Sequence, residues 1–188
     1  MASLIWLTDI HLNFVEEHHR ELFYQSVRAA NCDGVVLTGD IAEAPTVEST
    51  LIELEAELDV PLYFVLGNHD FYYGSIVDVR HRVTDLCETE PRLQYLTGGG
   101  VVSLSPTVGL LGHDGWADAR EGDYERSYVM MNDYRLIHEF TGINKSDRWP
   151  ILQAMGDSAA TEVRRQSKKL MFIKIKPQNC LHMKLELN

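Results

Sequence analysis

Three short apolar segments, spaced about 30 residues apart, constrain the fold of this chain more than any other feature. They cover residues 4–8, 34–38 and 62–66. Each is apolar over nearly its whole length instead of alternating with polar residues, which is typical of strands buried on both faces of a parallel sheet. The sequence therefore predicts three parallel strands within the first 66 residues.

Helical patterns lie between and after these segments. Apolar residues recur at helical spacing, and Pro45 stands where the second helix should begin. The three stripes are Phe23, Val27 and Ala30; then Val47, Leu51, Leu54 and Leu58; then Ile76, Val79, Val83 and Leu86. Strands that alternate with helices form βαβ units, so the predicted fold class is α/β.

The pattern changes after Gly98-Gly99-Gly100. Residues 101–104 and 108–111 are short apolar segments joined by Ser105-Pro106-Thr107, which predicts an antiparallel hairpin. Further helices are expected over residues 128–140 and 155–166, and residues 170–175 have strand character.

Polar residues come directly after each of the three predicted parallel strands. They are Asp9-Ile10-His11, then Gly39-Asp40, then Gly67-Asn68-His69-Asp70. The carboxyl ends of parallel strands share one edge of a sheet, so we expect the three groups to meet there. One Asp-x-His at a strand end is usually a turn or a cap. Three such groups in order favour a site for a borderline divalent cation such as Mn, Fe, Co or Zn.

These three motifs, D-x-H, GD and GNHD, resemble the opening motifs of the calcineurin-like metallophosphoesterases. The resemblance covers residues 4–70 and continues more loosely to about residue 140. It implies an α/β sandwich that hydrolyses phosphomonoesters or phosphodiesters, with a water activated by two divalent ions. In that family pattern, Asp9 and His11 bind the first metal, Asp40 bridges both, and Asn68 binds the second.

The resemblance also implies catalytic roles for the next two residues. His69 would protonate the leaving oxygen or steady the charge on the phosphate, and Asp70 would orient His69. The substrate implied is a phosphate ester, and its identity stays open.

The later part of the chain departs from the family pattern. The family takes further histidine ligands there, one alone and two in a G-H-x-H motif. Gly112-His113-Asp114-Gly115 begins like that motif but has glycine at its fourth position, so His113 is a weaker candidate ligand. We therefore expect a sandwich that lacks part of its second sheet. The alternative function is that of a truncated, catalytically impaired homologue that serves as a binding or regulatory domain.

Composition adds a boundary and several exclusions. Residues 164–188 hold seven of the 17 Lys and Arg residues but one of the 28 acidic residues. The expected division is a phosphoesterase domain over residues 1–163 and a distinct basic tail over residues 164–188. A net charge of −11 does not indicate nucleic-acid binding, and no apolar run is long enough for a membrane span. The three cysteines are odd in number and form no CxxC pair, which argues against a disulfide framework and favours a cytoplasmic protein. The oligomeric state stays open.

Overall fold

A four-stranded parallel sheet organises the molecule. The computed structural model describes residues 3–170. The strands are β1 (Leu4–Leu7), β2 (Gly34–Thr38), β3 (Leu62–Val65) and β4 (Leu93–Tyr95), and they lie side by side in chain order. The helices α1 (Glu17–Ala29), α2 (Val47–Leu58) and α3 (Ile76–Thr89) connect them. The predicted α/β fold with parallel strands is confirmed.

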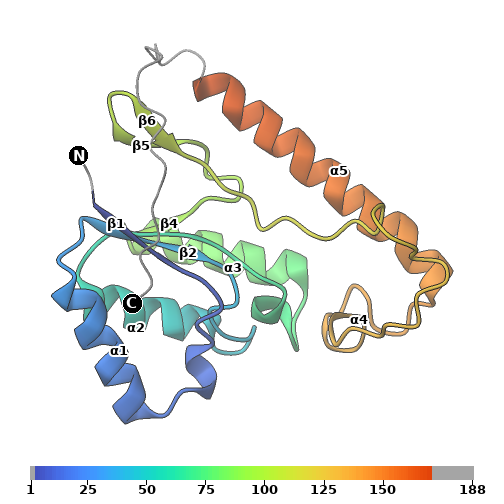
Figure 1. Ribbon diagram of the computed structural model, residues 1–188, viewed down its shortest axis with the longest axis horizontal. Coiled ribbons are helices and arrows are strands. Elements are labelled where there is room, and N and C mark those ends of the chain that lie inside the picture. The colour runs from blue at the N-terminus through green and yellow to red at the C-terminus, as the bar shows by residue number, and fades with distance from the viewer. Residues whose placement is uncertain (1–2, 171–188) are drawn as a thin grey trace.

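One face of this sheet carries the core. Val35, Leu37, Leu62 and Phe64 are at most 1% exposed, and they pack in one cluster with Leu51 and other apolar residues of the helices. Figure 1 shows α1 and α2 on this side of the sheet. Neighbouring strands place Val35 beside Leu62, so apolar side chains line up across the sheet.

The opposite face is less covered than the sequence predicts. Trp6, Val36 and Tyr63 lie side by side across β1, β2 and β3 and form what we call the open face. Trp6 is 50% exposed, while Val36 and Tyr63 are partly buried. The expectation of burial on both faces is therefore wrong for this face. Figure 1 shows why: a small hairpin and the last helix lie on that side, and neither covers the sheet as the connecting helices do.

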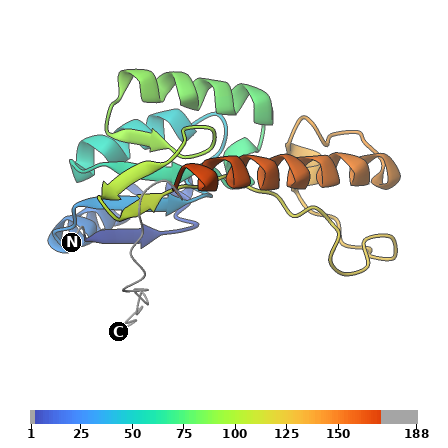
Figure 2. The ribbon, with the colours of Figure 1, turned by 90° about the horizontal axis from the view of Figure 1, so that it is seen from above.

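The hairpin forms as predicted. Strands β5 (Val102–Ser105) and β6 (Val108–Leu110) pair antiparallel, with Val102 opposite Leu110. The helix expected over residues 128–140 is mostly wrong, since α4 covers only Asp133–Leu136. The last helix of the described residues, α5 (Lys145–Leu170), begins well before the expected residue 155. Figure 2 shows the C-terminal end of α5 near the hairpin and the rest of the helix extending away from the sheet.

The boundary predicted at residue 164 falls inside α5. Residues 171–188, with most of the segment of strand character, lie outside the described residues, so the division into domain and tail stays a prediction. Among residues 3–170, no helix has both the length and the apolar character that crossing a membrane requires.

Candidate metal centre

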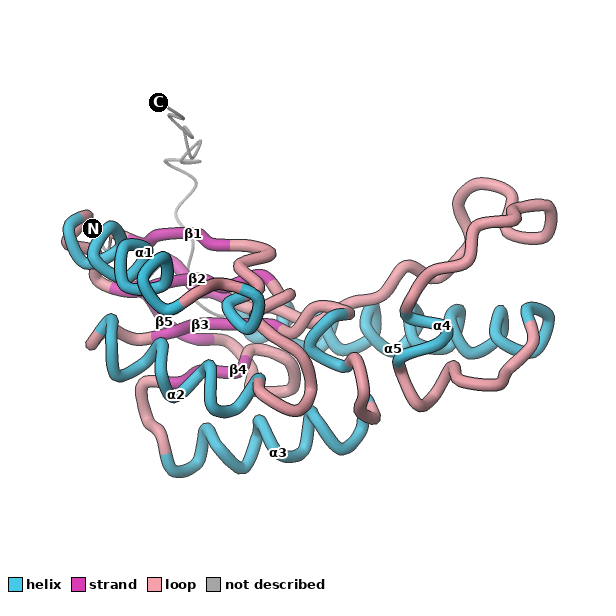
Figure 3. Tube along the Cα trace, turned by 90° about the horizontal axis from the view of Figure 1, so that it is seen from below, coloured by secondary structure: helices cyan, strands magenta, loops and turns pink. Residues whose placement is uncertain are grey.

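The candidate site lies where β1, β2 and β3 end. The loops after β1 and β2 are joined by backbone hydrogen bonds, from the Asp9 N–H to the Gly39 carbonyl (3.2 Å) and from the His11 N–H to the Asp40 carbonyl (3.0 Å). Asp9, His11 and Asp40 all have left-handed backbone conformations, with φ of 52°, 42° and 52°. Such conformations are uncommon for residues other than glycine, and they turn the chain sharply at the strand ends. In Figure 3 the loops after these strands emerge on one side of the sheet.

Three side chains converge at this edge. One ligand atom each from His11, Asp40 and His69 lies within 4.8 Å of the others. His11 Nε2 is 3.8 Å from Asp40 Oδ2, and the two imidazole rings are 4.6 Å apart. Asp40 Oδ1 accepts a hydrogen bond from the His69 backbone N–H (3.1 Å), which fixes the carboxylate between the loops.

The donor atoms of this cluster fit a divalent cation. The Nδ1 atoms of His11 and His69 are buried without a hydrogen-bond partner among residues 3–170. Buried polar atoms of this kind are costly, and two imidazoles beside a carboxylate suit Zn, Mn, Fe or Co. The residues present therefore fit at least one ion.

Two glycines allow the loops after β2 and β3 to touch. A Cβ on Gly67 would lie 2.1 Å from Asp40 Oδ1, and a Cβ on Gly39 would lie 2.7 Å from the Gly67 Cα. Gly39 also has a φ of +91°, which side chains rarely tolerate. Both glycines of the GD and GNHD motifs are therefore required by close packing.

Asp70 lies beneath this contact and is completely buried. Its Oδ1 accepts from the backbone N–H groups of Ile41 (2.9 Å) and Ala42 (2.8 Å), and its Oδ2 accepts from that of Gly67 (2.8 Å). Burial raises the pKa of Asp70 to about 7, although these N–H groups act in the opposite direction. Asp70 thus joins the two loops through their backbones. Its predicted role in orienting His69 stays a prediction.

Asp9 lies outside the three-residue cluster, and the side-chain nitrogen of Asn68 is engaged by other residues. The Asn68 amide donates to Asp133 Oδ1 (2.9 Å) and to the Tyr72 hydroxyl (3.1 Å). Asp9 is exposed, and its carboxylate accepts from the Thr8 hydroxyl. Their assignment as metal ligands stays a prediction.

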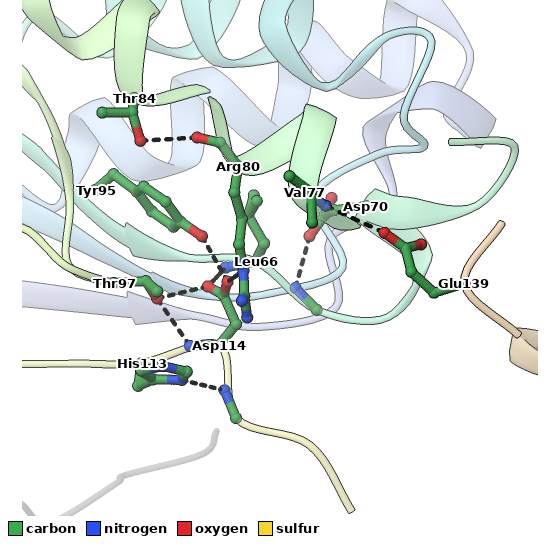
Figure 4. A network of polar contacts seen from close by, with 12 residues as sticks. Leu66, Asp70, Val77, Arg80, Thr84, Tyr95, Thr97, His113, Asp114 and Glu139 are labelled. Carbon is green, nitrogen blue, oxygen red and sulfur yellow. Dashed lines mark hydrogen bonds and ion pairs between the residues drawn. The ribbon is translucent and has the colours of Figure 1, made fainter. Parts of the chain in front are cut away.

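His113, the weaker candidate, serves a different local structure. Its Nδ1 accepts from the Gly115 N–H (2.9 Å), burial lowers its pKa, and it is not part of the cluster. The neighbouring Asp114 has a fully buried side chain and accepts from the Leu66 N–H (2.8 Å) and from Arg80 Nε (2.9 Å). Figure 4 shows this network, in which Tyr95 and Thr97 also bind Asp114. This network fixes the backbone of Leu66, the last residue before the GNHD motif.

Comparison with known proteins agrees with this arrangement. The family model of the calcineurin-like phosphoesterases matches residues 2–169. No curated protein and no solved structure matches the chain. The chain belongs to the calcineurin-like phosphoesterase family, which confirms the resemblance carried by its three motifs. Membership implies metal-dependent hydrolysis of phosphate esters.

Proposed function

We propose that this protein is a metal-dependent hydrolase that uses two divalent ions to cleave phosphomonoesters or phosphodiesters. The observation that carries the proposal is the convergence of His11, Asp40 and His69, which are drawn from three separate strand ends. Family membership supports the class of reaction. A basic groove of the kind that binds nucleic acid is not expected at a net charge of −11, so a small phosphate ester is the favoured substrate.

Each residue has a proposed part in binding. Asp9 and His11 would hold one ion, Asn68 the other, and Asp40 would hold both. When bound, the ions would supply an activated water and neutralise charge on the phosphate. His69 would donate a proton to the leaving oxygen, and the place of its imidazole beside His11 and Asp40 supports this role. Asp70 would keep the loops of Asp40 and Asn68 together through their backbones.

The test is hydrolysis by protein that has been stripped and reloaded with metal. Chelator-treated protein is reloaded with Mn, Zn, Fe or Co, and bound metal is measured by plasma mass spectrometry. Hydrolysis of p-nitrophenyl phosphate and of bis(p-nitrophenyl) phosphate is then followed by absorbance. We expect about two ions per chain and metal-dependent turnover. The His81→Ala variant is a matched control, because His81 is exposed on α3 and pairs with Asp85.

A binding or regulatory domain is the second candidate. It is favoured by the position of Asp9 outside the cluster of His11, Asp40 and His69. Bound metal without turnover on either ester would support this candidate and contradict the hydrolase. Protein that binds no divalent ion would contradict the proposed metal centre altogether.

A further inference from the structure

Asn68 is held by two buried residues that belong to none of the three motifs. Its Nδ2 donates to Asp133 Oδ1 (2.9 Å) and to the Tyr72 hydroxyl (3.1 Å). The Tyr72 hydroxyl in turn donates to the same oxygen of Asp133 (2.7 Å). The three polar groups therefore form a closed ring. Asp133 is 2% exposed and Tyr72 is 4% exposed.

The ring leaves the Asn68 side chain one orientation. An amide nitrogen has two hydrogens, and both are taken by oxygen atoms of the ring. A carboxylate can only accept, so rotating the amide would set the Asn68 carbonyl oxygen against Asp133 Oδ1, acceptor against acceptor. The side-chain oxygen of Asn68 has no hydrogen-bond partner among residues 3–170 and is the atom left to meet a cation.

The backbone around Asp133 keeps it beside Asn68. The Tyr73 N–H donates to the Leu136 carbonyl (2.8 Å), and the His138 N–H donates to the Gly74 carbonyl (3.0 Å). These bonds join the segment after the GNHD motif to the segment around α4, which follows it by some 60 residues. The Tyr72 ring also packs on the imidazole of His69, with centroids 4.2 Å apart. Tyr72 therefore contacts the side chains of both Asn68 and His69.

We propose that Asp133 is a positioning residue, which together with Tyr72 turns the side-chain carbonyl of Asn68 towards the second divalent cation. This inference rests on the proposed function, because it assumes that the centre holds two ions. It assigns to α4 a part in metal binding that none of the three motifs contains.

The experiment measures affinity for Mn²⁺ by calorimetry, without any assay of activity. Asp133→Asn can present either oxygen or nitrogen to Asn68, so the carbonyl is no longer fixed. We expect the weaker of two Mn²⁺ affinities to fall by about 10- to 100-fold, and the tighter one to stay unchanged. The control is Asp85→Asn, which alters an exposed carboxylate on α3 and should leave both affinities unchanged.

Exchanging the two side chains separates positioning from folding. In the double variant Asn68→Asp with Asp133→Asn, the new amide donates to one carboxylate oxygen and leaves the other for the ion. We expect this variant to recover most of the lost affinity. If Asp133 had a purely structural role, the exchange would not restore the affinity. If Asp133→Asn does not fold, the double variant is compared with Asn68→Asp alone. Higher affinity in the double variant is the expected result there, and equal or lower affinity overturns the inference.

The remaining outcomes are distinct. An unchanged affinity in folded Asp133→Asn, or a loss that the exchange does not recover, overturns the role of Asp133 and leaves the proposed function standing. Wild-type protein that binds a single Mn²⁺ overturns the inference, because no second ion exists to be positioned, and it contradicts the two-ion form of the proposed function but not metal binding itself. Wild-type protein that binds none overturns the proposed function as well.

Discussion

The surroundings of His69 are compatible with two roles, that of a metal ligand and that of a proton donor. Its ligand atom lies within 4.8 Å of those of His11 and Asp40, which would suit a metal ligand. Its backbone N–H holds Asp40, and its ring is flanked by His11 and Tyr72, which would suit a proton donor fixed beside the ions. Metal affinity separates these roles, because only a ligand is needed for the ion to stay bound.

We predict that Asp40→Ala weakens metal binding by more than about 100-fold and His69→Ala by less than about 10-fold. Asp40 would be shared by both ions, whereas His69 would act outside their coordination. Calorimetric titration of each variant with Mn²⁺ measures the difference, with His81→Ala as the control. Equal losses in the two variants would make His69 a ligand.

The residues of the site differ in how far the sequence could reveal them. His11, Asp40 and His69 lie just after the first three parallel strands, so their meeting could be expected from parallel pairing. Asp133 had no such signal. It binds Asn68 across 65 residues, and that contact depends on how the chain returns to the sheet after the hairpin. A lone aspartate in a polar sequence looks the same whether it is buried or solvated.

At the scale of elements, the turns after β2 and β3 act as one unit because glycine lets them touch. We predict that Gly67→Ala displaces the Asp40 carboxylate, since the new methyl carbon would lie 2.1 Å from Asp40 Oδ1. Metal affinity should fall by at least about 10-fold, with a loss of about 1–3 kcal/mol in the free energy of unfolding. Titration and chemical denaturation measure the two effects. His81→Ala is the control, because His81 is exposed on α3 and pairs only with Asp85 among the described residues. Unchanged affinity in Gly67→Ala would show that the turns can separate freely.

The helices and strands could be predicted where an apolar segment had both the length and the spacing typical of one kind of element. The first three strands and the helices that connect them meet this condition, whereas β4 has only three residues, which is too short for a recognisable pattern. The helix expected over residues 128–140 is mostly wrong because Tyr128, Val129 and Met130 are exposed rather than packed on a core. The early start of α5 did have a signal. Asn144 accepts from the Asp147 N–H (3.0 Å) and caps the helix, although Pro150 follows within it.

For the whole molecule, the core is concentrated around the sheet. We predict that amide hydrogens of β2, β3 and α2 exchange most slowly, because Leu37, Leu54 and Phe64 are buried to 1% exposure or less. Within residues 3–170, we expect residues 117–131 to exchange fastest, since they are mostly exposed and contain no helix or strand. Hydrogen exchange followed by mass spectrometry gives both rates from one sample. Slow exchange in residues 117–131 would contradict this distribution of stability.

The open face also gives the protein an optical probe of its own. The Trp6 indole N–H donates to the Thr38 hydroxyl (2.8 Å), at the last residue of β2 before the Gly39-Asp40 turn. The ring is therefore fixed at one edge, while the residue as a whole is 50% exposed to solvent. Its fluorescence emission and its quenching by acrylamide depend on that solvent contact. Subtracting the spectrum of Trp6→Phe removes the contributions of Trp116 and Trp149, so anything that covers the open face would register as a blue shift and weaker quenching.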